Sequence, residues 1–310
     1  MLRSTQTGPR AYAVPRHEAT AMANTLQDHP RISVVTPSFN QDEFLEATLR
    51  SVITQGYPEL EYVVIDGGST DDSVSIIERY EADLAYWVSE PDQGHAHALN
   101  KGFAQTTGEI MCWVNSSDLY YPWTFEIVAE VFAAFPQVEW ITGAISMVDV
   151  CGRPKVVASA SGVNVFDVLA GDYRWRIQQE SVFWRRSLWE RAGGRLDQAL
   201  TCAADLDLWL RFFRLVPLYR VGTLLGGFRV HDDCLGDAGD DLYGREAKQL
   251  HSRFVSRYDR TSLARARLIR LFGDGKRKMV VKGLSEIGLL PWYKHPQVVF
   301  DFDHMVWAIL

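Results

Sequence analysis

Two short apolar runs in this chain each end in carboxylates and small polar residues, and this repeated arrangement constrains the fold more than any other feature. The run from Glu61 to Ile65 leads into Asp66 and the Gly67–Asp72 turn. The run from Ile110 to Val114 leads into Asn115-Ser116-Ser117-Asp118. Short apolar runs bounded by turn residues are typical of buried strands. Ligands of open α/β sheets bind at the carboxyl ends of strands, so these two ends predict a site for a nucleotide and its metal ion.

Strand and helix patterns alternate from Arg31 onward, which predicts an α/β fold with a mostly parallel sheet flanked by helices. Residues 160–235 are less regular, and the pattern after Gly239 predicts helix up to residue 310. We therefore divide the chain into a flexible extension (1–30), a catalytic domain (31–238) and a helical C-terminal extension (239–310). The expected strands are Ile32–Thr36, Tyr62–Ile65, Leu84–Val88, Met111–Val114 and Trp140–Val148, and the expected helices are Asp42–Thr54, Asp72–Tyr80, Trp123–Phe135 and one that ends near Gly108.

The distribution of charge excludes one class of partner. Residues 245–282 contain 12 Lys or Arg against 3 Asp or Glu, whereas the chain as a whole has a net charge of −7, so the rest is strongly acidic. An acidic body argues against nucleic acid as a partner. The basic segment leaves three alternatives open: an anionic membrane surface, self-association through the C-terminal helices, and a solvated helical face.

The compartment follows from the cysteines and the apolar runs. The four cysteines are far apart and form no CxxC pair, which argues against a zinc site or a disulfide framework. No apolar run is as long as a membrane span, and residues 1–20 contain no apolar segment typical of a signal peptide. We expect a cytoplasmic protein, with peripheral attachment to the inner face of the membrane as an alternative.

Seven short motifs in order give the chain a resemblance to a known family. It resembles the family 2 glycosyltransferases, which are inverting enzymes of GT-A fold that use nucleotide-activated sugars. The resemblance extends over residues 31–235, about two thirds of the chain. The motifs are Val35–Asn40, Ile65–Asp71, Ala98–Gly102, Trp113–Asp118, Gln179–Arg186, Ala204–Arg211 and Phe228–His231.

The resemblance implies a role for each candidate residue. It places a nucleotide-sugar half at 31–118 and an acceptor half at 119–238. Asp205 matches the catalytic base, and Asp118 and His231 match ligands of Mn²⁺ or Mg²⁺. The expected acceptor-binding residues are Glu180, Trp175 and Trp184. The expected donor-binding residues are Thr36, Pro37, Asn40, Asp66, Asp92, Lys101 and Ser117.

The expected reaction is transfer of a sugar, with inversion, from a nucleoside diphosphate sugar to a saccharide or lipid-linked saccharide. We expect a UDP-sugar as donor and a place in bacterial-type polysaccharide or glycoconjugate synthesis. One departure supports an alternative: Ser117 stands where relatives commonly have an Asp, and a hydroxyl brings no negative charge to a cation. A degenerate domain that binds nucleotide-sugar or glycan without turnover therefore remains the alternative. A dinucleotide-binding oxidoreductase is disfavoured, because no GxGxxG follows the first strand.

Overall fold

The computed structural model describes residues 29–158, 163–171, 177–231, 242–258, 263–264, 296–302 and 304–310. The strands of this part are β1 (Ile32–Ser38), β2 (Leu60–Asp66), β3 (Tyr86–Ser89), β4 (Ile110–Trp113), β5 (Leu119–Tyr120), β6 (Trp140–Thr142), β7 (Ile145–Val148), β8 (Pro154–Ala158), β9 (Val182–Arg185), β10 (Tyr219–Val221), β11 (Gly226–Arg229), β12 (Gln297–Asp301) and β13 (Val306–Ile309). The α-helices are α2 (Asp42–Ile53), α3 (Ser73–Arg79), α4 (His95–Ala104), α5 (Thr124–Ala134), α6 (Val165–Leu169), α7 (Arg186–Arg191), α8 (Ala204–Phe213) and α9 (Leu242–Val255), and the 3₁₀ turns are η1 (Glu81–Asp83) and η2 (Gln179–Ser181).

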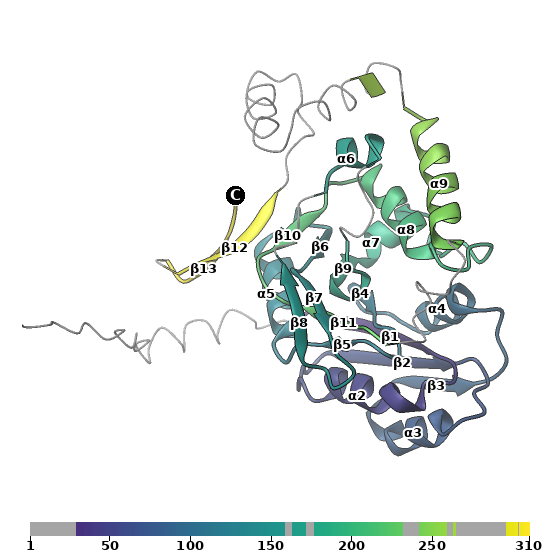
Figure 1. Ribbon diagram of the computed structural model, residues 1–310. Helices are drawn as coiled ribbons and strands as arrows, with labels where there is room; N and C mark the ends of the chain where they lie inside the picture. The colour runs from purple at the N-terminus through teal and green to yellow at the C-terminus, as the bar shows by residue number, and fades with distance from the viewer. Residues whose placement is uncertain are drawn as a thin grey trace, which may run out of the picture.

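A large sheet forms the centre of the molecule, and helices flank it (Figure 1). Among the described residues its strand order is β13-β12-β10-β6-β9-β4-β1-β2-β3, and a smaller sheet has the order β5-β11-β7-β8. β1 pairs in parallel with both β2 and β4, and β2 pairs in parallel with β3. β9 runs antiparallel between β4 and β6. The sheet is therefore mostly parallel, as the sequence predicts.

The amino-terminal half follows the predicted elements closely. The four expected strands and four expected helices up to residue 135 all form, with ends that differ by a few residues. All seven residues of β1 are buried. Central strands of a parallel sheet are covered on both faces, which explains why these strands are continuous apolar runs.

The next segment departs from prediction because one expected strand is two. Trp140–Val148 divides into β6 in the large sheet and β7 in the small one. Gly143 lies at the division, where an added Cβ would be 2.9 Å from Leu225 Cγ and 3.0 Å from the Thr223 carbonyl oxygen. The chain changes sheets there because only a glycine permits this approach. Residues 160–235 are also more regular than expected, since they include β9, α7, α8, β10 and β11.

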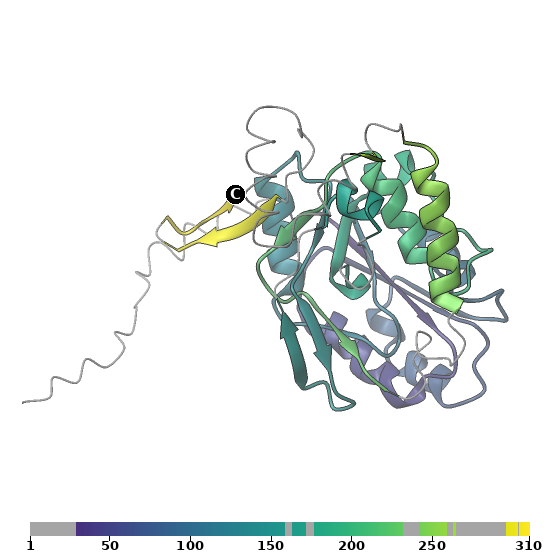
Figure 2. The same cartoon turned by 45° about the horizontal axis from the view of Figure 1, so that its top comes forward.

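The C-terminal region is only partly helical. The helix α9 confirms the prediction for its own range, but Gln297–Asp301 and Val306–Ile309 form β12 and β13, so helix up to the end is wrong. β12 adds to the large sheet beside β10, and Val298 is fully buried. The hairpin projects from the edge of the sheet in both views (Figures 1 and 2). Its β-branched and aromatic residues favour strand once a neighbouring strand is available.

Two predicted features of the termini lie outside the described residues. The expected extension covers residues 1–30, of which 1–28 are not described, and residues 259–262 and 265–282 of the basic segment are not described either. Within the part that is described, no helix is both long and apolar enough to cross a membrane.

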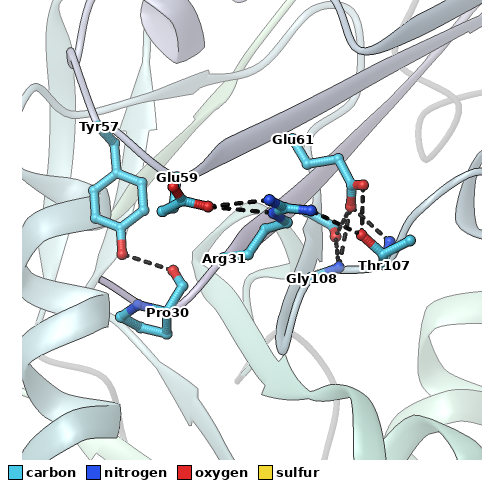
Figure 3. A network of polar contacts seen from close by, with 8 residues as sticks. Pro30, Arg31, Tyr57, Glu59, Glu61, Thr107 and Gly108 are labelled. Carbon is cyan, nitrogen blue, oxygen red and sulfur yellow. Dashed lines mark hydrogen bonds and ion pairs between the residues drawn. The ribbon is translucent and has the colours of Figure 1, made fainter. Parts of the chain in front are cut away.

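A network of polar contacts fixes the amino ends of the parallel strands (Figure 3). One Glu61 carboxylate oxygen accepts hydrogen bonds from Ser33 Oγ (2.6 Å), Thr107 N (2.7 Å) and Gly108 N (3.1 Å). The other accepts from Thr107 Oγ1 at 2.8 Å. Arg31 forms an ion pair with Glu59 at 3.2 Å and also donates to Thr107 Oγ1. These contacts join β1, β2 and the turn before β4 at the edge opposite the predicted site.

Candidate active site

Three loops converge where β1, β2 and β3 end. Asn40 adopts a positive φ of 49° after β1, which lets its backbone N–H donate to Ser69 Oγ (2.8 Å) and its side-chain oxygen accept from Thr70 N (2.9 Å). A Cβ added to Gly67 would lie 2.9 Å from Asp92 Oδ2 and 3.3 Å from the Phe39 ring. The Asp92 carboxylate and the exposed Phe39 ring therefore lie close to the Gly67 backbone, and the predicted donor residues Asn40 and Asp92 lie on adjacent loops.

Other predicted donor residues are engaged within the fold. Asp66 is fully buried, and its two carboxylate oxygens accept four hydrogen bonds, from Gly68 N, Ser69 N, Ser69 Oγ and Ser89 Oγ. Its side chain therefore shapes the turn, and the donor contact expected from this side chain does not fit. The side-chain contact expected from Thr36 does not fit either, because its hydroxyl is fully buried and shares a hydrogen bond with Tyr62.

The remaining donor candidates are placed less directly. Pro37 is buried within β1. Lys101 lies on α4 and forms an ion pair of 2.6 Å with Glu90 in the loop after β3. Ser117 is half-buried, and its carbonyl oxygen accepts a hydrogen bond of 2.6 Å from Arg229 Nε. Donor contacts by these three residues stay predictions.

Asp118 is held from three sides at the end of β4. One carboxylate oxygen accepts from the Arg229 backbone N–H (2.9 Å), and the other accepts from the Asn115 side-chain amide (3.1 Å). Thr48 on α2 donates to the Asp118 carbonyl oxygen at 2.6 Å. Burial raises the pKa of Asp118, although the hydrogen bonds from Arg229 and Asn115 oppose this. Burial thus makes the charged form of this carboxyl group less favourable than in an exposed aspartate, and a cation nearby would offset that penalty.

Glu180 is close enough to the two other acidic residues of the site, Asp118 and Asp205, for both charges to act on it. It is 2% exposed, belongs to the 3₁₀ turn η2, and accepts a hydrogen bond from Gln178 Nε2. Burial raises its pKa well above the ordinary value, and the negative charges of Asp118 and Asp205 raise it further. Gly226 on β11 packs directly on its backbone, where any Cβ would collide with the Glu180 carbonyl. Glu180 is thus enclosed rather than displayed on the surface.

Asp205 lies in the first turn of α8, as the sequence predicts. Its carboxylate accepts a hydrogen bond of 2.6 Å from the Leu206 backbone N–H. Burial raises the pKa of Asp205 to about 6, and the charge of Glu246 on α9 contributes in the same direction. Asp207, two residues later, forms an ion pair of 2.9 Å with Arg211, so its role is structural. The two aspartates of one helix therefore have different environments.

The donor groups around Asp118 fit a metal site that needs ligands from the substrate. In the described part of the chain, no three His, Cys, Asp or Glu side chains gather as a metal site. Each Asp118 oxygen accepts one hydrogen bond, and a carboxylate has about four lone-pair directions, so two remain for a cation. His231 lies two residues after Arg229 and packs on Phe44, with 4.8 Å between ring centroids. Asp118 and His231 could hold Mn²⁺ or Mg²⁺ only together with phosphate oxygens.

The tryptophans expected to stack on sugars are not in position to do so. Trp184 is fully buried in β9. Its ring packs against Trp113 at 5.5 Å and Trp209 at 5.8 Å between centroids, so it is a core residue and the prediction for it is wrong. Trp175 lies outside the described residues.

Sequence reasoning missed several polar residues that organise the site. His95 Nε2 lies 2.8 Å from Asn115 Oδ1, and the Asn115 amide nitrogen donates to Asp118 and to Gln179 Oε1. Gln179 Nε2 in turn donates to the Trp113 carbonyl oxygen at 2.7 Å. Asn115 and Gln179 belong to two of the seven motifs. Their hydrogen bonds join segments that are far apart in the sequence, and a local motif does not predict such contacts.

Part of the chain matches a known protein family. Residues 33–145 match the family model described as glycosyl transferase family 2. The chain contains a domain of glycosyl transferase family 2. This domain is 42% identical over 92 residues to an uncharacterised glycosyltransferase of Mycobacterium tuberculosis, a match that covers 29% of this chain and 35% of the relative. An uncharacterised glycosyltransferase of Nostoc is 30% identical over 135 residues, which cover 42% of this chain and 41% of the relative. The matched part thus spans well under half of these relatives.

Solved structures show that the glycosyltransferase domain has the GT-A fold. TarS of Staphylococcus aureus (residues 1–349, in complex with UDP-GlcNAc) aligns with a TM-score of 0.60 at 16% identity, over 85% of this chain and 76% of that one. A mannosyltransferase of Pyrobaculum calidifontis, in complex with GDP-mannose and Mn²⁺, aligns with a TM-score of 0.51 at 18% identity, over 90% of this chain and 89% of that one. The predicted fold class is confirmed.

Proposed function

We propose that this protein is a glycosyltransferase that moves a sugar, with inversion, from a nucleoside diphosphate sugar to a saccharide or lipid-linked saccharide. The observation that carries the proposal is the gathering of Asp118, Glu180 and Asp205. They come from the end of β4, from η2 and from the start of α8, and the charges of Asp118 and Asp205 both act on Glu180. Buried carboxyl groups with raised pKa values are costly to a fold and are typical of active sites.

Each group then has a chemical task. Asp205 accepts the proton of the acceptor hydroxyl, because a pKa of about 6 leaves it ionised yet basic at neutral pH. The acceptor oxygen attacks the anomeric carbon while the bond to the diphosphate breaks. Asp118 and His231, together with the diphosphate, would hold a divalent cation, which would supply positive charge against the leaving group. Glu180, which is enclosed, holds a proton beside Asp118 and Asp205 in this scheme and does not contact the acceptor.

The nucleoside end of the donor lies in this proposal against Phe39, Asn40 and Asp92. The Phe39 side chain is 60% exposed beside the Gly67 turn, although large aromatic side chains are usually covered. An exposed ring at the carboxyl edge suits stacking on a nucleobase, which is worth roughly 1–3 kcal/mol. The Asp92 carboxylate next to it suits hydrogen bonding to ribose or base. We expect uridine as the nucleoside, since TarS, a protein of similar fold, was solved with UDP-GlcNAc.

A panel of nucleotide-sugars tests the proposal. The protein is mixed with UDP-, GDP- and dTDP-sugars, with Mn²⁺ or Mg²⁺ and a mixture of saccharide acceptors, and release of nucleoside diphosphate is measured. Proton NMR of the product reports the anomeric configuration, and an inverted centre is expected. Tight donor binding without release under any condition would favour the degenerate, binding-only alternative that Ser117 suggests. An absence of binding to every nucleotide-sugar would overturn both.

We also propose the cytoplasmic face of the membrane as the place of work, in bacterial-type polysaccharide or glycoconjugate synthesis. The +9 balance of residues 245–282 supports this, because clustered Lys and Arg attract anionic head groups. Sedimentation with vesicles of phosphatidylglycerol and phosphatidylcholine at low salt tests it. Binding that disappears at high salt is expected. If the protein does not bind the vesicles, self-association and a solvated helical face are the alternatives that are left, and light scattering distinguishes them.

A further inference from the structure

A carboxylate from the C-terminal region holds the loop that leads into α8. Glu246 of α9 accepts hydrogen bonds from three consecutive backbone N–H groups: Thr201 (2.9 Å), Cys202 (3.0 Å) and Ala203 (2.9 Å). The first N–H groups of a helix and of the residues before it have no partner within the helix. An anion that binds several of them is stabilised by the positive end of the helix dipole. Ala203 is the N-cap residue of α8, so Glu246 bonds the N-cap N–H as the glutamate of a capping box does, but from 43 residues away.

The position of Glu246 is itself fixed by packing. Ala247, Leu250 and Phe254 on the same helix are 0%, 4% and 4% exposed and belong to the main core. α8 and α9 lie side by side in both views (Figures 1 and 2). The carboxylate is therefore presented by a rigid element, and displacement of α9 would displace the loop with it.

The same loop is held at its start by two other side chains. The Asn100 amide exchanges hydrogen bonds with the Leu196 backbone, at 2.8 Å from Leu196 N and 3.0 Å to Leu196 O. Arg211 donates to the carbonyl oxygens of Ala192 and Arg195. These contacts end at residue 196. Residues 201–203, which immediately precede the helix of Asp205, receive their side-chain contacts from Glu246.

We propose that Glu246 is a positioning residue for catalysis: it fixes the Thr201–Ala203 backbone and thereby sets the place and orientation of Asp205 at the start of α8. The inference rests on the proposed function, because it takes Asp205 as the base. It also revises the expectation that the region after residue 239 is separate from catalysis. α9 then belongs to the catalytic unit.

Electrostatics add a second effect of the same residue. The groups that act on Asp205 or on which Asp205 acts are Glu180 on η2, Cys202 in the loop and Glu246 on α9. The negative charge of Glu246 raises the pKa of Asp205, and Asp205 raises the pKa of Glu180 and of Cys202. A base with a higher pKa is a stronger base once ionised. Glu246 therefore increases the basicity of Asp205 as well as fixing its position.

Two substitutions separate these effects. Glu246→Ala removes all three hydrogen bonds, and a misplaced base should lower kcat about 10–100-fold. Glu246→Gln keeps one acceptor oxygen and removes the charge. The pKa of Asp205 then falls, so the pH at which kcat/KM reaches half its plateau should move to lower pH. Loss of a merely structural contact would lower activity equally at every pH. Gln249→Ala, an exposed position on α9, is the matched control and should behave as wild type.

Hydrogen exchange provides a measurement that does not depend on activity. The amides of residues 201–203 should exchange faster in Glu246→Ala than in wild type or Gln249→Ala, while α9 itself keeps its protection. If exchange and the pH profile of both Glu246 variants match wild type while Asp205→Asn is inactive, the positioning role is wrong and the proposed function stands. If wild type transfers no sugar from any donor, the proposed function fails, and the exchange result alone decides whether Glu246 holds the loop.

Discussion

Carboxyl groups at the two edges of the large sheet have pKa values that are shifted in opposite directions. At the amino edge, burial opposes ionisation of Glu61, but hydrogen bonds from Ser33, Thr107 and Gly108 outweigh it and lower the pKa of this carboxyl group. At the carboxyl edge, burial raises the pKa values of Asp118, Glu180 and Asp205, and the acidic neighbours of Glu180 and Asp205 add to the effect. The charged form of Glu61 is thus stabilised, whereas the charged forms of Asp118, Glu180 and Asp205 are penalised.

The difference lies in the partners that the fold supplies. The amino edge adds arginines, with ion pairs between Arg31 and Glu59 and between Arg185 and Glu109. At the other edge Arg229 directs its guanidinium to the carbonyl oxygens of Ser117, Asp149 and Val150, and Asp118 receives its backbone N–H instead. A fold that leaves carboxylates without full compensation loses stability there and gains groups that bind cations and protons. The comparison teaches that the functional edge is recognised by its lack of compensation.

The largest expected effect is on turnover at the carboxyl edge. Asp205→Asn keeps the shape of the side chain and removes its basicity, so transfer should fall by roughly 10²–10⁴-fold. Donor binding should survive, because the donor residues lie on other loops. Steady-state kinetics and calorimetry measure the two quantities. Asp207→Asn on the same helix is the control and should have a small effect. Near-normal transfer by Asp205→Asn would remove Asp205 from the mechanism.

The next effect concerns the coupling between metal and nucleotide. With Asp118 as the one carboxylate of the β4 end that faces the site, metal alone should bind weakly, and nucleoside diphosphate should bind more tightly with Mn²⁺ or Mg²⁺. A coupling of roughly 5–150-fold is ordinary for two linked ligands. Asp118→Ala should abolish it, whereas Ser117→Asp should raise metal affinity without nucleotide. Calorimetry checks both. Donor binding and turnover that ignore a chelator would contradict the metal site.

At the amino edge a substitution should affect stability and leave catalysis intact. Glu61→Gln removes the charge that four hydrogen bonds stabilise, and should lower the free energy of unfolding at pH 7 by about 1–3 kcal/mol. A carboxyl group with a lowered folded pKa stabilises the fold above its unfolded value near 4.3 and loses this as the pH falls. The difference in the free energy of unfolding between wild type and Glu61→Gln should therefore become smaller below pH 4. Urea denaturation at several pH values measures it, with kcat as the control.

A stability effect of opposite sign is expected at the opposite edge. The pKa of Asp205 in the folded protein is about 6, above the ordinary value near 3.9. Ionisation of Asp205 therefore destabilises the wild-type fold, and the protein loses this stability as the pH rises through 6. The free energy of unfolding of Asp205→Asn, compared with that of wild type, should therefore increase from pH 4 to pH 8, by roughly 1–3 kcal/mol at most. Thermal denaturation at both pH values tests this. A loss at pH 8 would show that the two edges do not differ in this way.

The sequence by itself determined the elements whose signals are local. Continuous apolar runs bounded by turn residues gave β1, β2 and β4, and the acidic start of an apolar stripe located Asp205 in the first turn of α8. Strand periodicity and helix starts depend on neighbouring residues, so they can be read from one segment. The division into donor and acceptor halves stays a prediction.

Tertiary structure decided which side chains are covered and which segments meet. Trp184 and Thr36 have side chains of the kind expected in a sugar-binding site, yet neighbouring strands and helices bury them. Residues 297–309 become strands because β10 offers them an edge. Glu246 reaches residues 201–203 only because α9 packs beside α8. Burial and hydrogen bonding across large sequence separations depend on how elements pack, and packing is a property of the whole fold rather than of any one segment.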